Sequence, residues 1–535
     1  MRAPDFFTHA SRLVCLLEQL LSEGWNQTTL AGAIGVSQPT INRLSNEVCS
    51  RPQKTANADR CGKSCQRNLT QMIQTLIGLN FQLTSQQEVA LKKIAEFLTS
   101  SKRMFGLFGY AGTGKSTIVN LVAEQLVSAG KRVVFTAPTN KAVGVLRRMA
   151  AEKKVQGVDL MTIHQLLGLA PVKQGQQRIL KQVSSSLLYM YDIIFLDECS
   201  MVTEELWNII EERINNALLL GSNRQLIVMG DPAQLPPVNE EINERKSQSF
   251  NVPDKTILTE VVRQGTGSPL LEFVTACRIA VKSKKVFEPF SKFNPDKKNG
   301  AFLVKEQTLL KYALKKFSTK FNRDPDCFRL LCYTNERVAY WNQKIRAKIY
   351  GKDAPKFVIG ERLISKAPVI APDGKTIILA TSTEVEVVEF VEDRYSGYKA
   401  WNVKVKTEAG ELRQIYILHE DDVRKFKRDN NRLLRNAKRN PSLWKAWYEH
   451  CDTFADMRNC WAITVHNSQG STFIEVGIDS KDIRRKVATK LLYLARINPD
   501  RKAEYLKEYR DSVRACNQLF YVGASRARNR VFINT

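Results

Sequence analysis

The sequence lacks long apolar runs, and no stretch approaches the roughly 20 residues that a helix needs to cross a bilayer. Neither end carries the apolar core of a secretory signal. The eleven cysteines are scattered and form no dense disulfide framework. These absences argue against a membrane protein and against a disulfide-rich secreted protein. We therefore expect no membrane partner and a reducing, cytoplasmic location.

Acidic residues are also few, because 54 Asp and Glu stand against 81 Lys and Arg and leave a formal net charge of +27. A surplus of this size favours a polyanionic partner, and without a membrane that partner is nucleic acid. A merely basic soluble protein would have the same composition, so charge alone leaves both alternatives open. The 535 residues allow three or four domains, each with its own core.

Residues 1–75 differ from the rest of the chain. The stretch TTLAGAIGVSQPTINRLSN, residues 28–46, combines a small-residue helix, a turn at Gly35, a helix N-cap at Ser37 and a second helix. This is the outline of a helix-turn-helix, whose second helix could enter a major groove. A hairpin of helices that contacts protein has the same pattern, and both alternatives stay open. Residues 50–68 are polar and without periodicity, as in a linker.

From about residue 76 onward, strand and helix patterns alternate. RVVFTAP, YDIIFLDE, RQLIVMGD, FRLLCYTN and NRVFIN are short apolar runs, typical of strands buried on both faces of a parallel sheet. We therefore expect doubly wound α/β units. Residues 360–420 instead alternate apolar and polar positions, which predicts a small antiparallel barrel inserted in the second unit. Residues 424–445 carry nine Lys or Arg against one Asp, either as a solvated helix face or as a phosphate contact.

The stretch FGLFGYAGTGKSTIVN, residues 105–120, matches the phosphate-binding loop G-x-x-x-x-G-K-[ST] between a strand and a helix. Its glycines let backbone N–H groups turn toward phosphate oxygens, and the helix adds its positive end. Lys115 would reach the β- and γ-phosphates, and the Ser116 hydroxyl would join the Mg²⁺ shell.

Two further strand ends complete the predicted nucleotide site. Asp197 and Glu198 follow the run IIFL, at the carboxyl end of a buried strand where ligands of such sheets bind. Asp197 is expected to hold Mg²⁺, and Glu198 to orient or deprotonate the attacking water. Gln234, in the loop of MGDPAQLPPV, is the amide that could sense the γ-phosphate.

In this order, the motifs resemble the RecD-like branch of the superfamily-one DNA helicases, and within it the phage Dda type, over residues 80–535. The resemblance is also carried by LTSQQEVAL, APTNKAV, MTIHQLLG, LTEVVRQ, YTNERVAYWN, AITVHNSQGSTF and LFYVGASRARNRVFI. It implies two RecA-like lobes, ATP and Mg²⁺ as cofactors, and single-stranded DNA and DNA forks as partners. We further expect a monomer in a host cytoplasm, with replication or single-strand-binding proteins as partners. Residues 1–75 lie outside the resemblance.

The resemblance completes three sets of site residues. The catalytic set is Lys115, Asp197, Glu198, Gln234, Arg263 and Arg526, with Arg526 as an arginine finger. The nucleotide set is Gln87, Gly109, Ala111, Gly112, Thr113, Gly114, Lys115, Ser116, Thr117 and Gly470, and the metal ligands are Ser116 and Asp197. The DNA-contacting set is Pro138, Thr139, Asn140, Thr162, His164, Thr334, Asn335, Thr464, His466 and Ser468.

The expected domains follow from these assignments. A helical segment and linker (1–75) precede the first RecA-like lobe (76–262), whose residues 168–185 would form a β-hairpin pin that splits the duplex. The second lobe comprises residues 263–359 and 456–535 and holds an SH3-like barrel with a basic helical extension (360–455). In the related helicases these parts brace the pin.

The resulting hypothesis is an ATP-dependent helicase that moves 5′→3′ on single-stranded DNA in phage or mobile-element replication or recombination. The polarity is implied only by the resemblance. An alternative is a DNA-binding regulator or loader whose ATPase acts as a conformational switch. A third is an RNA helicase or a nucleic-acid packaging motor.

Overall fold

The computed structural model describes residues 83–152, 156–174, 177–216, 224–237, 247–261, 267–319, 321, 324–371, 373 and 376–535. The predicted helix-turn-helix and linker (1–75) and the predicted catalytic Arg263 lie outside these residues. Among the described helices, none is long and apolar enough to cross a membrane.

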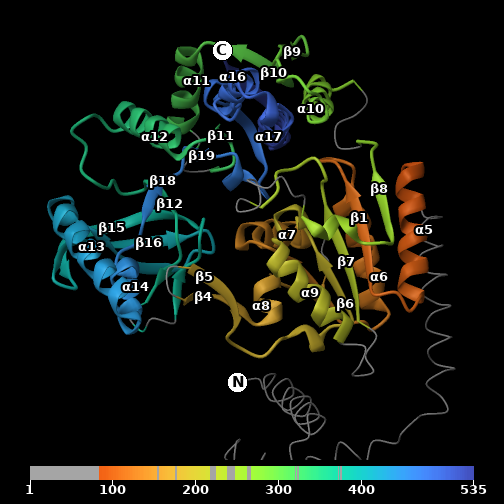
Figure 1. Ribbon diagram of the computed structural model, residues 1–535, viewed down its shortest axis with the longest axis horizontal. Helices are drawn as coiled ribbons and strands as arrows, with labels where there is room; N and C mark the ends of the chain where they lie inside the picture. The colour runs from red at the N-terminus through yellow and green to blue at the C-terminus, as the bar shows by residue number, and fades with distance from the viewer. Residues whose placement is uncertain are drawn as a thin grey trace, which may run out of the picture. The chain divides into compact units, whose positions relative to one another are not determined.

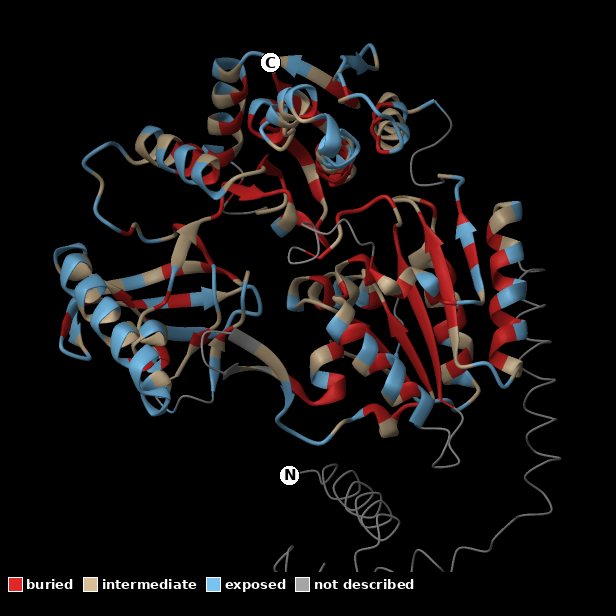
Figure 2. Ribbon diagram, in the orientation of Figure 1, coloured by how far each residue is buried: buried red, intermediate tan, exposed pale blue. Residues whose placement is uncertain are grey.

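The first lobe is built on a parallel sheet in the order β3-β2-β6-β7-β1-β8. In chain order its strands are β1 (Met104–Gly109), β2 (Val133–Ala137), β3 (Val158–Thr162), β6 (Ile193–Leu196), β7 (Gln225–Gly230) and β8 (Lys255–Leu258). The residues of β2, β6 and β7 are all buried, which explains why the sequence shows apolar runs there instead of alternation (Figure 2).

Helices cover both faces of this sheet (Figure 1). One core packs α5 (Ser85–Thr99) and α6 (Lys115–Ser128) against the sheet, and a second core packs α8 (Ile163–Leu167) and α9 (Glu204–Asn216). Neighbouring residues of β6 separate accordingly, because Ile193 and Phe195 join the first core while Ile194 and Leu196 join the second. The predicted doubly wound α/β unit is confirmed.

The second lobe has a similar sheet in the order β19-β11-β20-β21-β10-β9, parallel except for the edge strand β9. Its strands are β9 (Lys292–Phe293), β10 (Gly300–Val304), β11 (Phe328–Cys332), β19 (Ala462–Thr464), β20 (Phe473–Ile478) and β21 (Ala527–Asn534). Helices α10 (Pro269–Ala280) and α17 (Lys502–Ser525) pack on one core, and α11 (Glu306–Thr319) and α12 (Asn335–Ile349) pack on another. The chain therefore contains two α/β lobes, each built on a mainly parallel sheet.

Between β11 and β19 the chain forms an antiparallel sheet in the order β17-β16-β15-β12-β18. Its strands are β12 (Arg362–Ser365), β15 (Glu384–Tyr395), β16 (Tyr398–Thr407), β17 (Leu412–Leu418) and β18 (Met457–Asn459). The last strand lies beyond residue 455, where the sequence placed the end of the insertion. A short pair, β13 (Val369–Ile370) and β14 (Ile377–Leu379), adds to the insertion, whose own core includes Val387, Val403 and Ile415.

Two further features lie where the sequence placed them. The strands β4 (Leu169–Gln174) and β5 (Gln177–Gln182) pair as an antiparallel hairpin directly after α8. The basic segment folds as α13 (Val423–Arg439), followed by α14 (Trp444–Asp452), and packs beside the inserted sheet. The Lys and Arg side chains of α13 are exposed. Several of them line a shallow hollow along the helix, together with Asp429.

Candidate nucleotide site between the two lobes

The predicted phosphate loop connects β1 to α6, as the motif requires. Gly112 and Gly114 have φ angles of 83° and 82°, in the left-handed region that glycine adopts without strain. A Cβ on Gly114 would also collide with the side-chain amide of Gln87. Lys115, the first residue of α6, donates hydrogen bonds from Nζ to the carbonyl oxygens of Gly109 (2.7 Å) and Tyr110 (3.0 Å). The lysine therefore lies over its own loop.

Gln87 is held in place at the start of α5. Its backbone N–H donates to the Thr84 hydroxyl (3.3 Å), and its Oε1 accepts from the Thr84 N–H (3.0 Å), which together form a capping box. Its Nε2 donates to the carbonyl oxygen of Thr113 (3.1 Å), so the side chain contacts the phosphate loop directly.

The two carboxylates at the end of β6 are in an unusual environment. Glu198 has a φ of 51°, a left-handed conformation that is rare for residues other than glycine. Burial raises the pKa of Asp197. Burial and the neighbouring Asp197 raise the pKa of Glu198 to about 7, against the opposing effect of Arg526 and Lys115. A carboxyl group that titrates near neutral pH is suited to exchange a proton during a reaction.

A cavity of about 380 Å³ brings these groups together with the second lobe. Of the predicted site residues it is lined by Gln87, Ala111, Gly112, Thr113, Gly114, Lys115, Ser116, Thr117, Asp197, Glu198, Gln234, Gly470 and Arg526. Gly109 lies below the loop, at the end of β1, and is not part of the lining. The sequence thus predicted most of this cavity, from positions more than 400 residues apart.

Arg526 follows the last residue of α17 and is only 6% exposed. Its guanidinium group donates to the carbonyl oxygens of Val522 (3.2 Å) and Ser471 (3.3 Å). These contacts fix the side chain at the wall of the cavity that the second lobe supplies.

The structure adds site residues that the sequence did not single out. Asp231, directly after β7, is 1% exposed and lines the same cavity. The pattern that selected Asp197, an acidic residue at the end of a buried strand, also fits Asp231 and could have found it. Tyr521 and Gln518 of α17 contact the segment after β7 from the second lobe. No periodicity marks these two residues, because they lie in the C-terminal part of α17, where residues 516–524 are all buried.

The predicted DNA contacts of the first lobe lie at two adjacent strand ends. Pro138, Thr139 and Asn140 follow β2, and Thr162 ends β3. The Thr139 hydroxyl accepts a hydrogen bond from the Ala142 N–H (3.2 Å) at the start of α7 (Asn140–Glu152). The Thr162 hydroxyl accepts from the Gln165 N–H (3.1 Å) and caps α8. Burial lowers the pKa of His164, in the first turn of α8, so its ring is neutral at pH 7.

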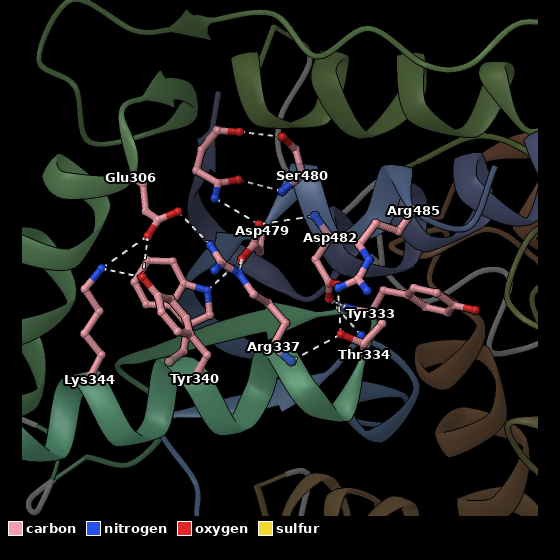
Figure 3. A network of polar contacts seen from close by, with 12 residues as sticks. Glu306, Tyr333, Thr334, Arg337, Tyr340, Lys344, Asp479, Ser480, Asp482 and Arg485 are labelled. Carbon is pink, nitrogen blue, oxygen red and sulfur yellow. Dashed lines mark hydrogen bonds and ion pairs between the residues drawn. The ribbon is translucent and has the colours of Figure 1, made fainter. Parts of the chain in front are cut away.

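In the second lobe, the predicted contacts also lie at strand ends, where a polar network surrounds two carboxylates (Figure 3). Asp482 accepts hydrogen bonds from the N–H groups of Tyr333 (2.7 Å) and Thr334 (2.8 Å) and from the Thr334 hydroxyl (2.8 Å). Asp479 accepts from Arg337 (2.5 Å) and from Trp341 (2.7 Å). The hydroxyl hydrogen of Thr334 therefore already has an acceptor in the protein.

The remaining predicted contacts also lie at strand ends: Asn335 comes after β11, Thr464 is the last residue of β19, and His466 and Ser468 come after β19. Asn335 is the first residue of α12. The Thr464 hydroxyl accepts from the Asn467 N–H (3.2 Å), and the His466 ring lies 6.3 Å from the Tyr333 ring. Ser468 is fully buried, and both its N–H and its hydroxyl donate to the carbonyl oxygen of Val465. Ser468 thus presents no donor at the surface, which favours a supporting role for it.

Comparison with known proteins agrees with this geometry. A model of a family described as an AAA domain matches residues 82–286, which include the phosphate loop and both carboxylates. The ATP-dependent DNA helicase dda of Enterobacteria phage T4 is 25% identical over 84% of this chain and 98% of its own length. The ATP-dependent RecD2 DNA helicase of Deinococcus radiodurans is 30% identical over 36% of this chain, which is 23% of that protein.

Among solved structures, Pif1 helicase from Bacteroides, in complex with ADP-AlF3 and single-stranded DNA, aligns with 85% of this chain at 16% identity and a TM-score of 0.44. The match to the phage helicase extends over nearly its whole length, and the family match covers the phosphate loop. The resemblance predicted from the sequence is confirmed, because the chain is similar over most of its length to a Dda-type, ATP-dependent DNA helicase of superfamily one.

Proposed function

We propose that this helicase uses ATP and Mg²⁺ to move 5′→3′ along single-stranded DNA and to separate the strands at a fork. One observation carries the proposal. The cavity between the lobes joins a phosphate loop and two carboxylates of one lobe to an arginine of the other. A reaction in such a cavity depends on the closure of the lobes, so hydrolysis can be coupled to their movement.

The residues present fit a nucleotide with a magnesium ion. The Ser116 hydroxyl and the Asp197 carboxylate line the same cavity and supply the oxygen ligands that Mg²⁺ prefers. Among the described residues, no group of three or more His, Cys, Asp or Glu could hold a metal alone. This agrees with an ion that is shared between few side chains and the phosphates, where it would neutralise phosphate charge.

The protein groups then divide the chemistry. The backbone N–H groups of the loop and Lys115 would bind the phosphates, and Glu198 would accept a proton from the attacking water. The Oε1 of Gln234 is buried and has no hydrogen-bond partner among the described residues, so it can orient that water. Arg526 would stabilise the charge of the transition state, which for an arginine finger contributes about 10³–10⁵ in rate.

A second cavity between the lobes, of about 570 Å³, supports contact with a DNA strand. It lies beside Gln234 and is lined by Tyr333, Arg485 and Lys486 of the second lobe and by Pro236 of the first. An aromatic ring next to cationic side chains is the combination that binds single strands without sequence preference. We assign Tyr333 as a ring that stacks on a base, a role the sequence could not allot to any aromatic residue.

The proposal extends to the remaining parts of the fold. The β4–β5 hairpin would be the pin that splits the duplex, since opening one base-pair step costs only about 1.4 kcal/mol. The inserted antiparallel sheet would be the SH3-like support of the pin, with α13 and α14 as its extension. The 5′→3′ polarity, a monomeric state, and a role in phage or mobile-element replication with single-strand-binding proteins follow the related helicases.

Strand displacement tests the proposal. Duplexes with a single 5′ tail or a single 3′ tail, in which one strand is labelled, are incubated with the protein and ATP, and the Lys115→Ala variant serves as the control. We expect displacement of the 5′-tailed duplex alone. Displacement of the 3′-tailed duplex alone would show that the protein moves 3′→5′ and would refute the proposed polarity. Hydrolysis without displacement of either duplex would identify a regulator or loader, and stimulation of hydrolysis by RNA rather than DNA would identify an RNA motor.

A further inference from the structure

Tyr521 makes a hydrogen bond across the cleft that neither the sequence motifs nor the comparisons assign. It lies on α17 in the second lobe and is 1% exposed. Its hydroxyl donates to Oδ2 of Asp231 in the first lobe, over 2.5 Å. The N–H of Ala111, in the phosphate loop, donates to both oxygens, at 3.0 Å to Asp231 and 3.1 Å to Tyr521. Tyr521 of the second lobe and Asp231 of the first lobe thus share one N–H donor of the phosphate loop.

A second contact on the same helix face reinforces this bond. Gln518 lies three residues before Tyr521, and its Nε2 donates to the carbonyl oxygen of Gln234 (3.0 Å). Asp231 in turn holds its own loop, because its Oδ1 accepts from the N–H of Ala233 (2.9 Å). Helix α17 therefore makes two hydrogen bonds to residues 231–234, and one of them is to Gln234, which also lines the second cavity.

The environment makes the Tyr521 bond strong and fixes its direction. Burial raises the pKa of Asp231, while Lys115 and the Tyr521 hydroxyl oppose the shift. Burial and the nearby Asp231 raise the pKa of Tyr521 far above its usual value, so the phenol keeps its proton and acts as the donor. A hydrogen bond between buried groups is stronger than one at the surface, and breaking it leaves a buried acceptor unsatisfied.

We propose that Tyr521 is a positioning residue for ATP hydrolysis, which links the closed cleft to the phosphate loop. Its helix ends at Ser525, directly before Arg526, and its hydroxyl touches both the loop of Gln234 and the N–H of Ala111. When the lobes part, this bond breaks. Arg526 and Gln234 are then no longer held in fixed positions relative to the phosphate loop. The inference rests on the proposed function and adds to it the contact that senses closure.

The Tyr521→Phe variant tests this role, because it removes one oxygen and keeps the ring in the core of the second lobe. With DNA present, we expect kcat for ATP hydrolysis to fall by about 10- to 100-fold while KM for ATP changes less than threefold. Such a split indicates lost stabilisation of the transition state at unchanged substrate binding. The control is Tyr505→Phe, on the same helix but outside both cavities, which should keep the wild-type kcat.

A double-mutant cycle with Asp231→Asn separates positioning from general damage. If the two side chains act through one bond, the double variant should be no slower than the slower single variant. Wild-type kcat in Tyr521→Phe would overturn the proposal. So would a parallel loss of melting temperature and of ATP binding, which would mean a structural role only. Because the readout is hydrolysis, its result stays distinct from strand displacement, on which the proposed function depends.

Discussion

Replacing Glu384 by glutamine should destabilise the protein strongly, although it changes no atom of the nucleotide site. Glu384 begins β15 in the insertion and is 8% exposed. Its carboxylate contacts the guanidinium group of Arg329 at 3.0 Å, and Arg329 is fully buried in β11 of the second lobe. Arg362 lies 3.9 Å away, and Lys141 of the first lobe lies 4.0 Å away. One buried carboxylate therefore compensates cations from three parts of the chain.

The expected magnitude follows from the charges that remain. Glu384→Gln keeps the shape of the side chain but leaves Arg329 buried without its counter-ion, which typically costs about 3–5 kcal/mol. Burial acts to raise the pKa of Glu384, but Arg329 and Lys141 outweigh it and the pKa lies below its usual value. A lowered pKa stabilises the folded state above the ordinary carboxyl pKa, and this stabilisation is lost as the pH falls through the folded-state value. The effect is therefore fully present at pH 7.5.

Thermal unfolding of the purified variants at pH 7.5 checks this prediction. A cost of about 3–5 kcal/mol corresponds to a decrease in Tm of about 6–20 °C for a domain of this size. The matched control is Glu389→Gln, the same change on the same strand at an exposed position, which should shift stability by no more than about 0.5 kcal/mol. If the two variants have the same Tm, Glu384 does not compensate the charge of the buried cations.

Further predictions concern the nucleotide site and the hairpin. Lys115→Ala should abolish ATP hydrolysis, and near-normal turnover in a phosphate-release assay would refute the assignment of the loop. Arg526→Ala should still bind a fluorescent ATP analogue but hydrolyse ATP at least about 10³-fold more slowly, so a loss of binding would contradict the finger role. Because burial raises the pKa of Glu198 to about 7 and its ionised form is the base, kcat should rise between pH 6 and 8, and a flat profile would exclude that role. Replacing residues 170–181 by a short Gly-Ser loop should spare DNA-stimulated hydrolysis but abolish strand displacement, and continued displacement would show that the hairpin is not the pin.

Much of the candidate site could be predicted because it depends on short-range rules. A strand, a glycine-rich turn and a helix N-terminus follow one another within residues 104–128, so the phosphate loop is a local structure. Asp197 lines the cavity with the phosphate loop because the carboxyl ends of parallel strands share one edge of a sheet. The hairpin and the alternating strands of the insertion are likewise visible in the chain itself.

For two of the predicted DNA contacts, the structure shows hydrogen-bond partners within the protein. The sequence selected Thr334 and Ser468 as DNA contacts, yet Thr334 gives its hydroxyl hydrogen to Asp482 and Ser468 is buried. Small hydroxyl residues at strand ends serve equally well as helix caps, and sequence patterns do not distinguish the two uses. Which use applies depends on the partner that the fold brings near.

The sequence by itself determined the two α/β lobes, the phosphate loop, the carboxylates at the end of β6 and the position of the insertion, because each depends on residues that are neighbours or share a strand. Only the tertiary structure decided which distant side chains meet. Tyr521 and Asp231 are 290 positions apart, and Arg329 and Glu384 belong to different sheets. Their contacts arise from how two lobes and an insertion pack, and such packing imposes no periodicity on the residues that it joins.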